Sequence, residues 1–247
     1  MNATIELMLN HRSIRKFTQQ TVSEEQLHAI IASAQMASSS SHVQAYSVIR
    51  VADPVKRERL AVLTSNQGYV AESPIFLVWC ADLYRNRVAF SLHGNPNHAY
   101  LNTAENMIVA TVDAALAAQN AAIAAESMGM GIVYIGGIRT QIREVTKLLE
   151  LPEWVYPVFG MCIGYPDQKV GIKPRLPMEA ILHQDSYQTS QVSTILESYD
   201  QTMSEYMLER TQGKVERKWS EDMKNKFASP SRLHMKAYLE EQGFYLQ

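Results

Sequence analysis

Hydrophobic and polar positions along the first part of the chain switch between helical and strand periodicity. Ser23 and Gln26 have the spacing of a capping box, and the apolar residues from Leu27 to Ala34 follow at helical intervals. A helix is therefore predicted to begin at this point. Residues 45–53, with the sequence AYSVIRVAD, are rich in β-branched and aromatic side chains and predict a strand.

The next elements continue this alternation. Asp53 and Pro54 suit the N-cap and the first turn of a helix that reaches Leu63. Residues 73–82, SPIFLVWCAD, form an apolar run typical of a buried strand. Residues 84–101 contain Gly94, Pro96 and asparagines, and we expect a long loop or lid there.

An alanine-rich helix is predicted from Thr103 to Met128, with Gly129 as its C-cap. Its side chains are small and apolar around most of the cylinder, so other backbones can approach it closely, and we place it at the centre of the fold. Further elements are predicted beyond it, namely a strand over 131–137, a helix over 141–149 and a strand over 155–166.

This order of elements indicates an α/β or α+β sandwich. Helices and strands alternate without an obvious linker up to about residue 187, which favours one layered domain. Residues 193–211 and 232–243 are helical, amphipathic and more charged. We therefore interpret residues 1–247 as a single domain in which residues 188–247 form a helical C-terminal extension, one that wraps a partner subunit.

Charge and composition exclude several classes of protein. The 247 residues carry a formal net charge of −2, and a nucleic-acid-binding protein usually has a basic excess. Polar residues interrupt the most apolar stretch, residues 108–130, so a membrane span is not expected. The N-terminus lacks a charged region and a long apolar run, and is no signal peptide. Cys80 and Cys162 lie in apolar runs and are expected to be buried, unpaired thiols of a cytoplasmic protein.

Several common chemical motifs are missing from the sequence. It has no phosphate-binding P-loop, no G-x-G-x-x-G fingerprint of a Rossmann site and no G-x-S-x-G elbow of a hydrolase. The seven histidines are scattered, and the closest pair, His93 and His98, lies in the predicted loop without cysteines. No metal site is therefore expected.

Two cationic segments could bind a phosphate group. In NHRSIRKF, residues 10–17, His11, Arg12 and Ser13 combine an imidazole, a planar cation and a hydroxyl. In GIKPRLP, residues 171–177, Lys173 and Arg175 flank Pro174 and precede Pro177. The prolines favour an extended chain, so both cations project to one side. Taken alone, a cluster such as NHRSIRKF is more often a solvated helix end, and the second segment alone is also a weak signal.

Polar and glycine-rich segments complete the pattern. Residues 38–44, SSSSHVQ, and Gln67 offer uncharged donors and acceptors that suit a sugar-like chain or a heteroaromatic edge. Gly136 and Gly137 end a strand, where a missing Cβ lets backbone N–H groups approach a flat ring, although an ordinary turn would use the same residues. Cations, polar groups and a glycine platform are together the requirements of a flavin mononucleotide (FMN) site.

A family resemblance is carried by the ordered motifs NHRSIRKF, ASSSS..QAYS, NQGYV, AAQNAAIAAESMGMGIVYIGGIR, VFGMCIGYP, KPRLP and HQDSYQ. The chain closely resembles the nitroreductase family, in particular its group of oxygen-insensitive NADPH nitroreductases and NADPH-dependent FMN reductases. The resemblance runs from about residue 4 to the C-terminus. It implies an α+β fold, a nitroreductase-like α/β/α sandwich with a mostly antiparallel central sheet, in an intertwined homodimer with two FMN sites at the subunit interface.

The resemblance also assigns residues. It implies FMN phosphate contacts for His11, Arg12, Ser13, Lys173 and Arg175, and places Arg15 at the ribityl and pyrimidine side. Ser39, with the neighbouring Ser40 and Ser41, would come from the other subunit, and Gln67 would lie at the ring edge or ribityl chain. Tyr134, Ile135, Gly136 and Gly137 would lie along the isoalloxazine, with a glycine N–H near N5. Arg210 matches the family's NADPH-binding arginine, and Lys214 and Arg217 are further candidates.

The function implied is electron transfer from NADPH, or NADH, to free flavin, nitroaromatics, quinones or azo compounds in a ping-pong cycle. Water can supply the protons, so no catalytic side chain is required. The alternatives are a non-catalytic flavin carrier or sensor, a family relative that performs ene reduction or dehalogenation, and a nucleotide- or CoA-binding protein that uses the cations without flavin.

Overall fold

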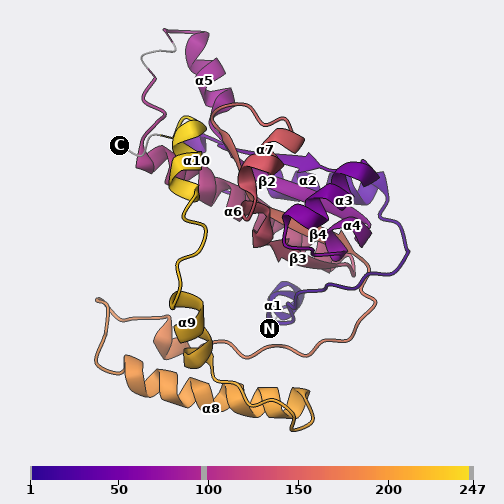
Figure 1. The fold of residues 1–247 in the computed structure, drawn as a ribbon, viewed down its shortest axis with the longest axis vertical. Coiled ribbons are helices and arrows are strands. Elements are labelled where there is room, and N and C mark those ends of the chain that lie inside the picture. Colours follow the sequence, from indigo (N-terminus) through magenta and orange to yellow (C-terminus); the bar gives the residue numbers. More distant parts are fainter. Residues whose placement is uncertain (1, 96–98, 245–247) are drawn as a thin grey trace. The chain divides into compact units, whose positions relative to one another are not determined.

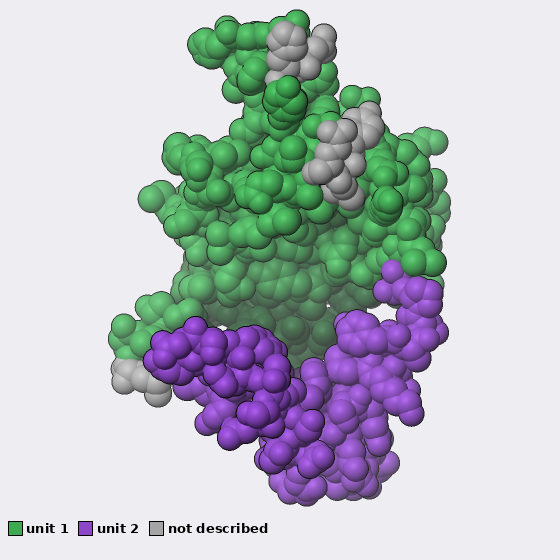
Figure 2. All heavy atoms as spheres, turned by 90° about the vertical axis from the view of Figure 1, so that its left-hand side faces the viewer, with its two compact units in different colours: residues 1–170, 232–247 green, residues 171–231 purple. Residues whose placement is uncertain are grey.

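A computed structural model describes residues 2–95 and 99–244 (Figure 1). The chain divides into two compact units, which Figure 2 colours separately. Unit 1 comprises Met1–Val170 and Arg232–Gln247, and unit 2 comprises Gly171–Ser231. Both chain ends thus belong to unit 1. A single domain over 1–247 with an extension from residue 188 stays a prediction.

Unit 1 is built on a four-stranded antiparallel sheet with the order β1-β2-β4-β3. The strands are β1 (Tyr46–Arg50), β2 (Ile75–Asp82), β3 (Gly131–Ile135) and β4 (Val155–Gly164). Every residue of β2 is buried, as its continuous apolar run predicts for a central strand. Phe76 lies opposite Cys162, and Cys162 in turn lies opposite Val133, which fixes the register of three strands.

Helices cover both faces of this sheet (Figure 1). Leu77 and Trp79 point to a core formed with α2 (Glu24–Gln35) and α6 (Ala104–Ser127). Phe76 and Val78 point to the opposite core, which contains residues of α3 (Pro54–Leu63), α4 (Tyr69–Glu72), the 3₁₀ helix η3 (Gly136–Arg139) and α7 (Ile142–Leu148). This alternation along β2 confirms the predicted α+β fold, an α/β/α sandwich with an antiparallel central sheet.

The helix α6 is the central helix of unit 1. It is long and apolar enough, by length and composition alone, to cross a membrane. Its buried residues, however, pack within the unit, and they are Asp113 and the alanines 110, 114, 117, 118, 121, 122 and 125. The small side chains let α2 and the sheet approach the α6 backbone closely, as the sequence predicts. The predicted start of α6 at Thr103 is also confirmed, because the Thr103 hydroxyl accepts a hydrogen bond from the Asn106 N–H at 3.2 Å and so caps the helix.

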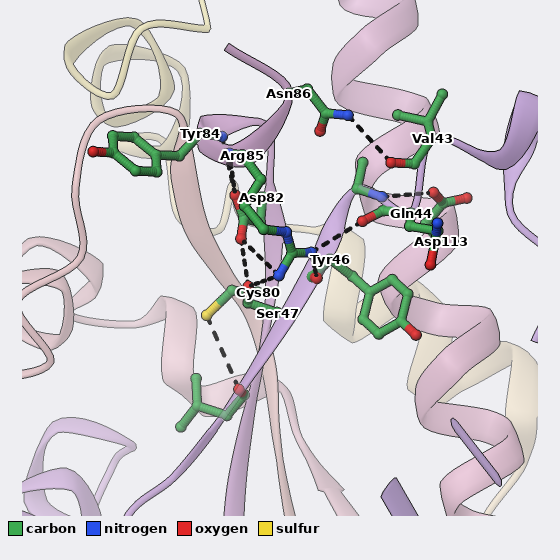
Figure 3. Close-up of polar contacts among 12 residues, drawn as sticks. Val43, Gln44, Tyr46, Ser47, Cys80, Asp82, Tyr84, Arg85, Asn86 and Asp113 are labelled. Atoms are coloured by element: carbon green, nitrogen blue, oxygen red, sulfur yellow. Dashed lines mark hydrogen bonds and ion pairs between the residues drawn. The ribbon is translucent and has the colours of Figure 1, made fainter. Parts of the chain in front are cut away.

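Two predictions about secondary structure are wrong. Residues 84–101 are not one long loop, because α5 occupies Tyr84–Ser91. Asp82 accepts hydrogen bonds from the N–H groups of Tyr84 at 3.0 Å and Arg85 at 3.4 Å, so a buried carboxylate from the end of β2 caps this helix (Figure 3). Residues 96–98, including His98, lie outside the described residues. The alternation of helices and strands ends with β4 at Gly164 instead of near residue 187.

The remaining helices belong partly to unit 1 and partly to unit 2. Two predicted C-terminal helices are confirmed as α8 (Val192–Arg210) and α10 (Met235–Glu241). Besides α5, six short helices of the described residues were not predicted, namely α1 (Ala3–Leu9), α4, α9 (Trp219–Phe227) and the 3₁₀ helices η1 (Ser40–His42), η3 and η4 (Met178–Ala180). In unit 2, α8 and the start of α9 are joined by Asp200, which accepts from the Ser220 N–H at 2.8 Å.

Both cysteines are buried and unpaired, as predicted. Burial raises the pKa of both thiols, and that of Cys162 reaches about 12. Both side chains therefore stay protonated at neutral pH and act as small apolar groups of the core.

Candidate functional site

The cationic segment around residues 11–15 runs beside one end of the sheet. The Ile14 N–H donates to the carbonyl of Ile132 on β3 at 2.9 Å, and the Thr18 N–H donates to the carbonyl of Tyr165 at 2.9 Å. The Asp167 N–H donates to the carbonyl of Lys16, also at 2.9 Å. These bonds hold the segment against β3 and the chain that leaves β4, so it is not a frayed helix end.

The contact between Ile14 and Gly131 is the closest part of this docking. Ile14 is buried, and a Cβ added to Gly131 would lie 2.4 Å from Cγ1 of Ile14. Only glycine allows this approach. On either side of Ile14, Arg12 and Arg15 are exposed and Ser13 is half-buried. The buried isoleucine therefore fixes the position of two exposed cations.

His11 joins the same segment to the last turn of α6. Its Nδ1 lies 2.6 Å from Oε1 of Glu126, whose side chain is only 11% exposed. This contact gives a hydrogen-bond partner to a carboxylate that lies unfavourably near a helix C-terminus. A cavity of about 200 Å³ next to this contact is lined by Arg12, Ile14, Glu126 and Gly131 among others.

The glycine pair at the end of β3 lies against Gln67. A Cβ added to Gly137 would lie 2.7 Å from the Thr64 carbonyl oxygen and 3.3 Å from Nε2 of Gln67. Gly136 has more room, since its added Cβ would meet only Nη2 of Arg139 at 3.6 Å. The structure thus brings together Gln67 and the glycines, which are 70 residues apart in the sequence.

The side chain of Gln67 carries a buried oxygen, Oε1, that has no hydrogen-bond partner in the structure. A buried acceptor without a donor is costly, and a bound water, ion or ligand can satisfy it. A hydroxyl of a sugar-like chain or a ring N–H would satisfy it. This acceptor, the glycine backbone beside it and the exposed cations near β3 fit the chemistry of FMN.

Neighbouring groups hold this part of the site in place. Arg57 donates to the Val70 carbonyl at 2.9 Å and to the Ser73 hydroxyl at 3.0 Å, and burial lowers its pKa. On the α6 side of the sheet, Tyr134 of β3 packs edge-on against Phe159 at 5.1 Å between ring centroids and donates to Oε1 of Gln119 at 3.2 Å. Burial raises the pKa of Tyr134, so its hydroxyl remains protonated at neutral pH. Ile135, the last residue of β3, is buried.

The serine segment lies on the other side of the sheet. Ser39, Ser40 and Ser41 follow α2, and the Ser40 N–H donates to Asp113 of α6 at 3.1 Å. Gln67 and Gly137 instead belong to elements that pack on the α3 side. Within one chain the serines and the glycine pair are therefore separated by the sheet.

Unit 2 contains the other predicted cations. Lys173 and Arg175 are both exposed, and Arg175 donates to the Lys173 carbonyl at 2.7 Å. Tyr199 of α8 donates to the Pro174 carbonyl at 3.0 Å, which anchors the segment between them. Convergence of Lys173 and Arg175 with Arg12 stays a prediction.

The predicted NADPH cations also belong to unit 2. Arg210 ends α8, and Arg210 and Lys214 are exposed. Nε of Arg217 lies 2.8 Å from Oδ1 of Asp222, an ion pair that occupies part of its guanidinium. Their role in binding NADPH stays a prediction.

Glu126 and Asp113 were not predicted as functional residues. The sequence signal was available, because both are acidic residues in an alanine-rich helix where a charge needs a specific partner. Their partners, His11 and the serine segment, lie 115 and 73 residues away in the sequence, so the pairing was not visible.

Comparison with known proteins identifies relatives over the whole chain. Residues 8–165 match the model of the nitroreductase family, and residues 173–247 match that of the nitroreductase family, C-terminal domain. An FMN reductase (NADPH) of Bacillus subtilis is 46% identical over 246 residues, which cover 99% of each chain. An oxygen-insensitive NADPH nitroreductase of Salmonella typhimurium is 43% identical and likewise covers 99% of each chain.

Solved structures agree with this fold. The structure of NfrA2 from B. megaterium is 39% identical, covers 100% of each chain and gives a TM-score of 0.96. The NADPH:FMN oxidoreductase of Vibrio harveyi, complexed with NAD⁺, is 41% identical, covers 98% of each chain and gives a TM-score of 0.88. With the fold, the paired glycines and the docked cationic segment in place, these matches show that the chain belongs to the nitroreductase family.

Proposed function

We propose that this protein is an FMN-dependent oxidoreductase that takes electrons from NADPH and passes them to small acceptors in a ping-pong cycle. The acceptors would be free flavin, nitroaromatics, quinones or azo compounds. Relatives named as NADPH-dependent FMN reductase, NADPH-flavin oxidoreductase and oxygen-insensitive NADPH nitroreductase support this activity. The observation that carries it here is the unpartnered, buried oxygen of Gln67 beside the Gly136–Gly137 backbone.

FMN supplies the redox chemistry when bound, because its ring accepts a hydride from a nicotinamide and returns the electrons to an acceptor. Arg12 and Ser13, with Lys173 and Arg175, would bind the phosphate through charge-assisted hydrogen bonds. His11, which Glu126 holds through Nδ1, would also lie at this phosphate end. Arg15 would place a cation at the pyrimidine side, where negative charge collects on reduction.

The other residues orient the ring and its side chain. Gln67 would accept a hydrogen bond from the cofactor, and Gly136 and Gly137 would offer backbone N–H groups without a Cβ in the way. Tyr134 and Ile135 are the last two residues of β3 and directly precede the glycines, so the strand fixes the position of the glycine backbone. No side chain is assigned as a general acid, since water reaches an open site and can supply the protons.

The active form would be a homodimer in which the serines reach the partner's flavin. The separation of Ser39–Ser41 from the glycine pair by the sheet supports this arrangement. An exposed apolar stripe on α6 supports it further, because Ile108, Val112 and Leu116 lie on one helical face and are 52%, 47% and 44% exposed. The enzyme would work in the cytoplasm, where its two unpaired thiols stay reduced.

The function is tested by visible absorption of the purified protein. We expect a yellow protein with bound FMN that bleaches with NADPH under anaerobic conditions and recolours with a nitroaromatic. Bleaching without recolouring would instead indicate a carrier or sensor. A colourless protein that does not take up FMN would refute the proposal.

Gly136→Ala tests the glycine platform. Its added methyl group has room in the protein alone, so the melting temperature should stay close to that of the wild type. Against a bound ring the methyl group would be overpacked, and the Kd for FMN should rise about tenfold or more. Gly94→Ala, on the chain that follows α5, is the control for a glycine substitution elsewhere; its added Cβ would lie 3.2 Å from the Phe90 ring, and the Kd should stay unchanged. Equal FMN affinity of wild type and Gly136→Ala would contradict the platform.

Arg210→Ala tests the NADPH site. Loss of a charge-assisted contact to the 2′-phosphate should raise the KM for NADPH about tenfold or more and leave the KM for NADH nearly unchanged. Steady-state kinetics with both nucleotides measure this ratio, with Lys224→Ala on α9 as a control for general loss of positive charge. Equal effects on both nucleotides would exclude a role at the 2′-phosphate.

Leu116→Glu tests the dimer. A charge within the α6 stripe should dissociate the two chains, because burying it unpaired is costly. Sedimentation should give about twice the chain mass of 27.9 kDa for the wild type and the chain mass itself for the variant, which should also lose FMN. Val55→Glu places the same charge on an exposed valine of α3 and should remain dimeric. A dimeric Leu116→Glu variant, or a monomeric wild type, would refute this interface.

A further inference from the structure

The serine segment has an unfavourable backbone conformation. Ser41, His42 and Gln44 have φ values of 46°, 57° and 51°, in the left-handed region that residues with a side chain rarely adopt. Three such residues within four positions are stable only where the surroundings hold them, and such strain is commonly found at functional sites. The contacts that hold this segment are therefore informative.

Asp113 of α6 holds both ends of the segment by their N–H groups. Its Oδ1 accepts from the Ser40 N–H at 3.1 Å and its Oδ2 accepts from the Ala45 N–H at 3.0 Å. The side chain is 1% exposed and lies among the buried alanines of α6. A carboxylate in such surroundings is costly unless its oxygens are hydrogen-bonded, so this residue is matched specifically to the segment.

Two residues of α5 hold the same segment by its carbonyl groups (Figure 3). Asn86 donates to the Val43 carbonyl at 3.2 Å. Arg85 donates to the Gln44 carbonyl at 3.1 Å and also to the Tyr46 carbonyl. The Arg85 guanidinium is in turn oriented by the Ser47 hydroxyl at 3.1 Å and by Asp82 at 3.7 Å.

These contacts leave the serines themselves available. Ser40 and Ser41 are exposed, and the Ser39 hydroxyl accepts from the Gln44 N–H at 3.3 Å while its own O–H remains free to donate. Asp113, Arg85 and Asn86 bind only backbone groups of the segment. The three side chains thus fix its shape without using the serine hydroxyls.

We propose that Asp113 and Arg85 are positioning residues that pre-organise residues 39–45 so that Ser39–Ser41 present their hydroxyl groups to FMN. The inference rests on the proposed function. A segment that is already ordered loses little conformational entropy when the cofactor binds, whereas a segment that samples many shapes lowers the affinity by the fraction of time it spends in the competent one. The contacts of Asp113 and Arg85 therefore affect the affinity for FMN. The rate of the redox step depends on the residues on the glycine side of the site.

The central experiment measures the Kd for FMN of the refolded or deflavinated Asp113→Asn variant by quenching of flavin fluorescence. The amide keeps the size of the side chain but presents an NH₂ group to one of the two backbone donors, so one end of the segment is released. We expect the Kd to rise about tenfold. At saturating FMN, kcat should stay within about twofold of the wild type, because the segment is then held by the cofactor.

Two further variants separate positioning from general stability. Asn120→Ala removes another hydrogen bond from α6, to the Ser33 carbonyl at 3.2 Å, and should lower the melting temperature without changing the Kd. Arg85→Ala alters a side chain that is 56% exposed, so it should fold even where Asp113→Asn does not, and should raise the Kd severalfold. If Arg85→Ala, and Asp113→Asn where it folds, bind FMN within about twofold of the wild type, the inference is overturned. A wild type that binds no FMN would instead refute the proposed function, and the inference with it.

Discussion

The contact between Ile14 and Gly131 is the constraint on which the candidate site depends. Because residue 131 has no side chain, Ile14 lies against the backbone of β3 and donates its N–H to the carbonyl of Ile132. A short run of charged residues next to a helix would otherwise be solvated and variable in position. Here a buried apolar anchor carries an exposed arginine one residue after it and another two residues before it, so two cations are fixed to the rigid sheet. The core of the unit thereby determines where these two arginines lie.

The same arrangement recurs around the rest of the site. Charged side chains hold the segments that line the candidate site. Asp113 and Arg85 bind backbone groups of the serine segment, Arg57 binds carbonyl groups of the chain after Gln67, and Glu126 binds the imidazole of His11. Such contacts are stronger than those between neutral groups and place irregular backbone accurately. An open site that accepts many flat acceptors can then remain rigid toward its cofactor.

Much of the fold follows from local patterns in the sequence. Local patterns predicted the helix that begins after Ser23, the buried strand β2 and the alanine-rich α6. Each of these elements has a clear capping, apolar or compositional pattern within its own consecutive residues. The helix α5 was missed because glycine, proline and asparagine follow it closely, and because its cap, Asp82, was assigned only to the preceding strand. The candidate site was likewise predictable only where the signal is local. The cations, serines and glycines could be named from motifs and from the family resemblance. The pairing of Asp113 with Ser40 joins residues 73 positions apart, which no local pattern reveals.

The measurement that tests this account most directly is the Kd for FMN of the Gly131→Ala variant, with circular dichroism to establish that the sheet is retained. The added Cβ would lie 2.4 Å from Cγ1 of Ile14, so the segment that carries Arg12 and Arg15 must move away from β3. The account predicts a loss of about 1 to 3 kcal/mol in stability and an increase of about tenfold or more in the Kd. A variant that folds with the same sheet content and binds FMN as tightly as the wild type would contradict it.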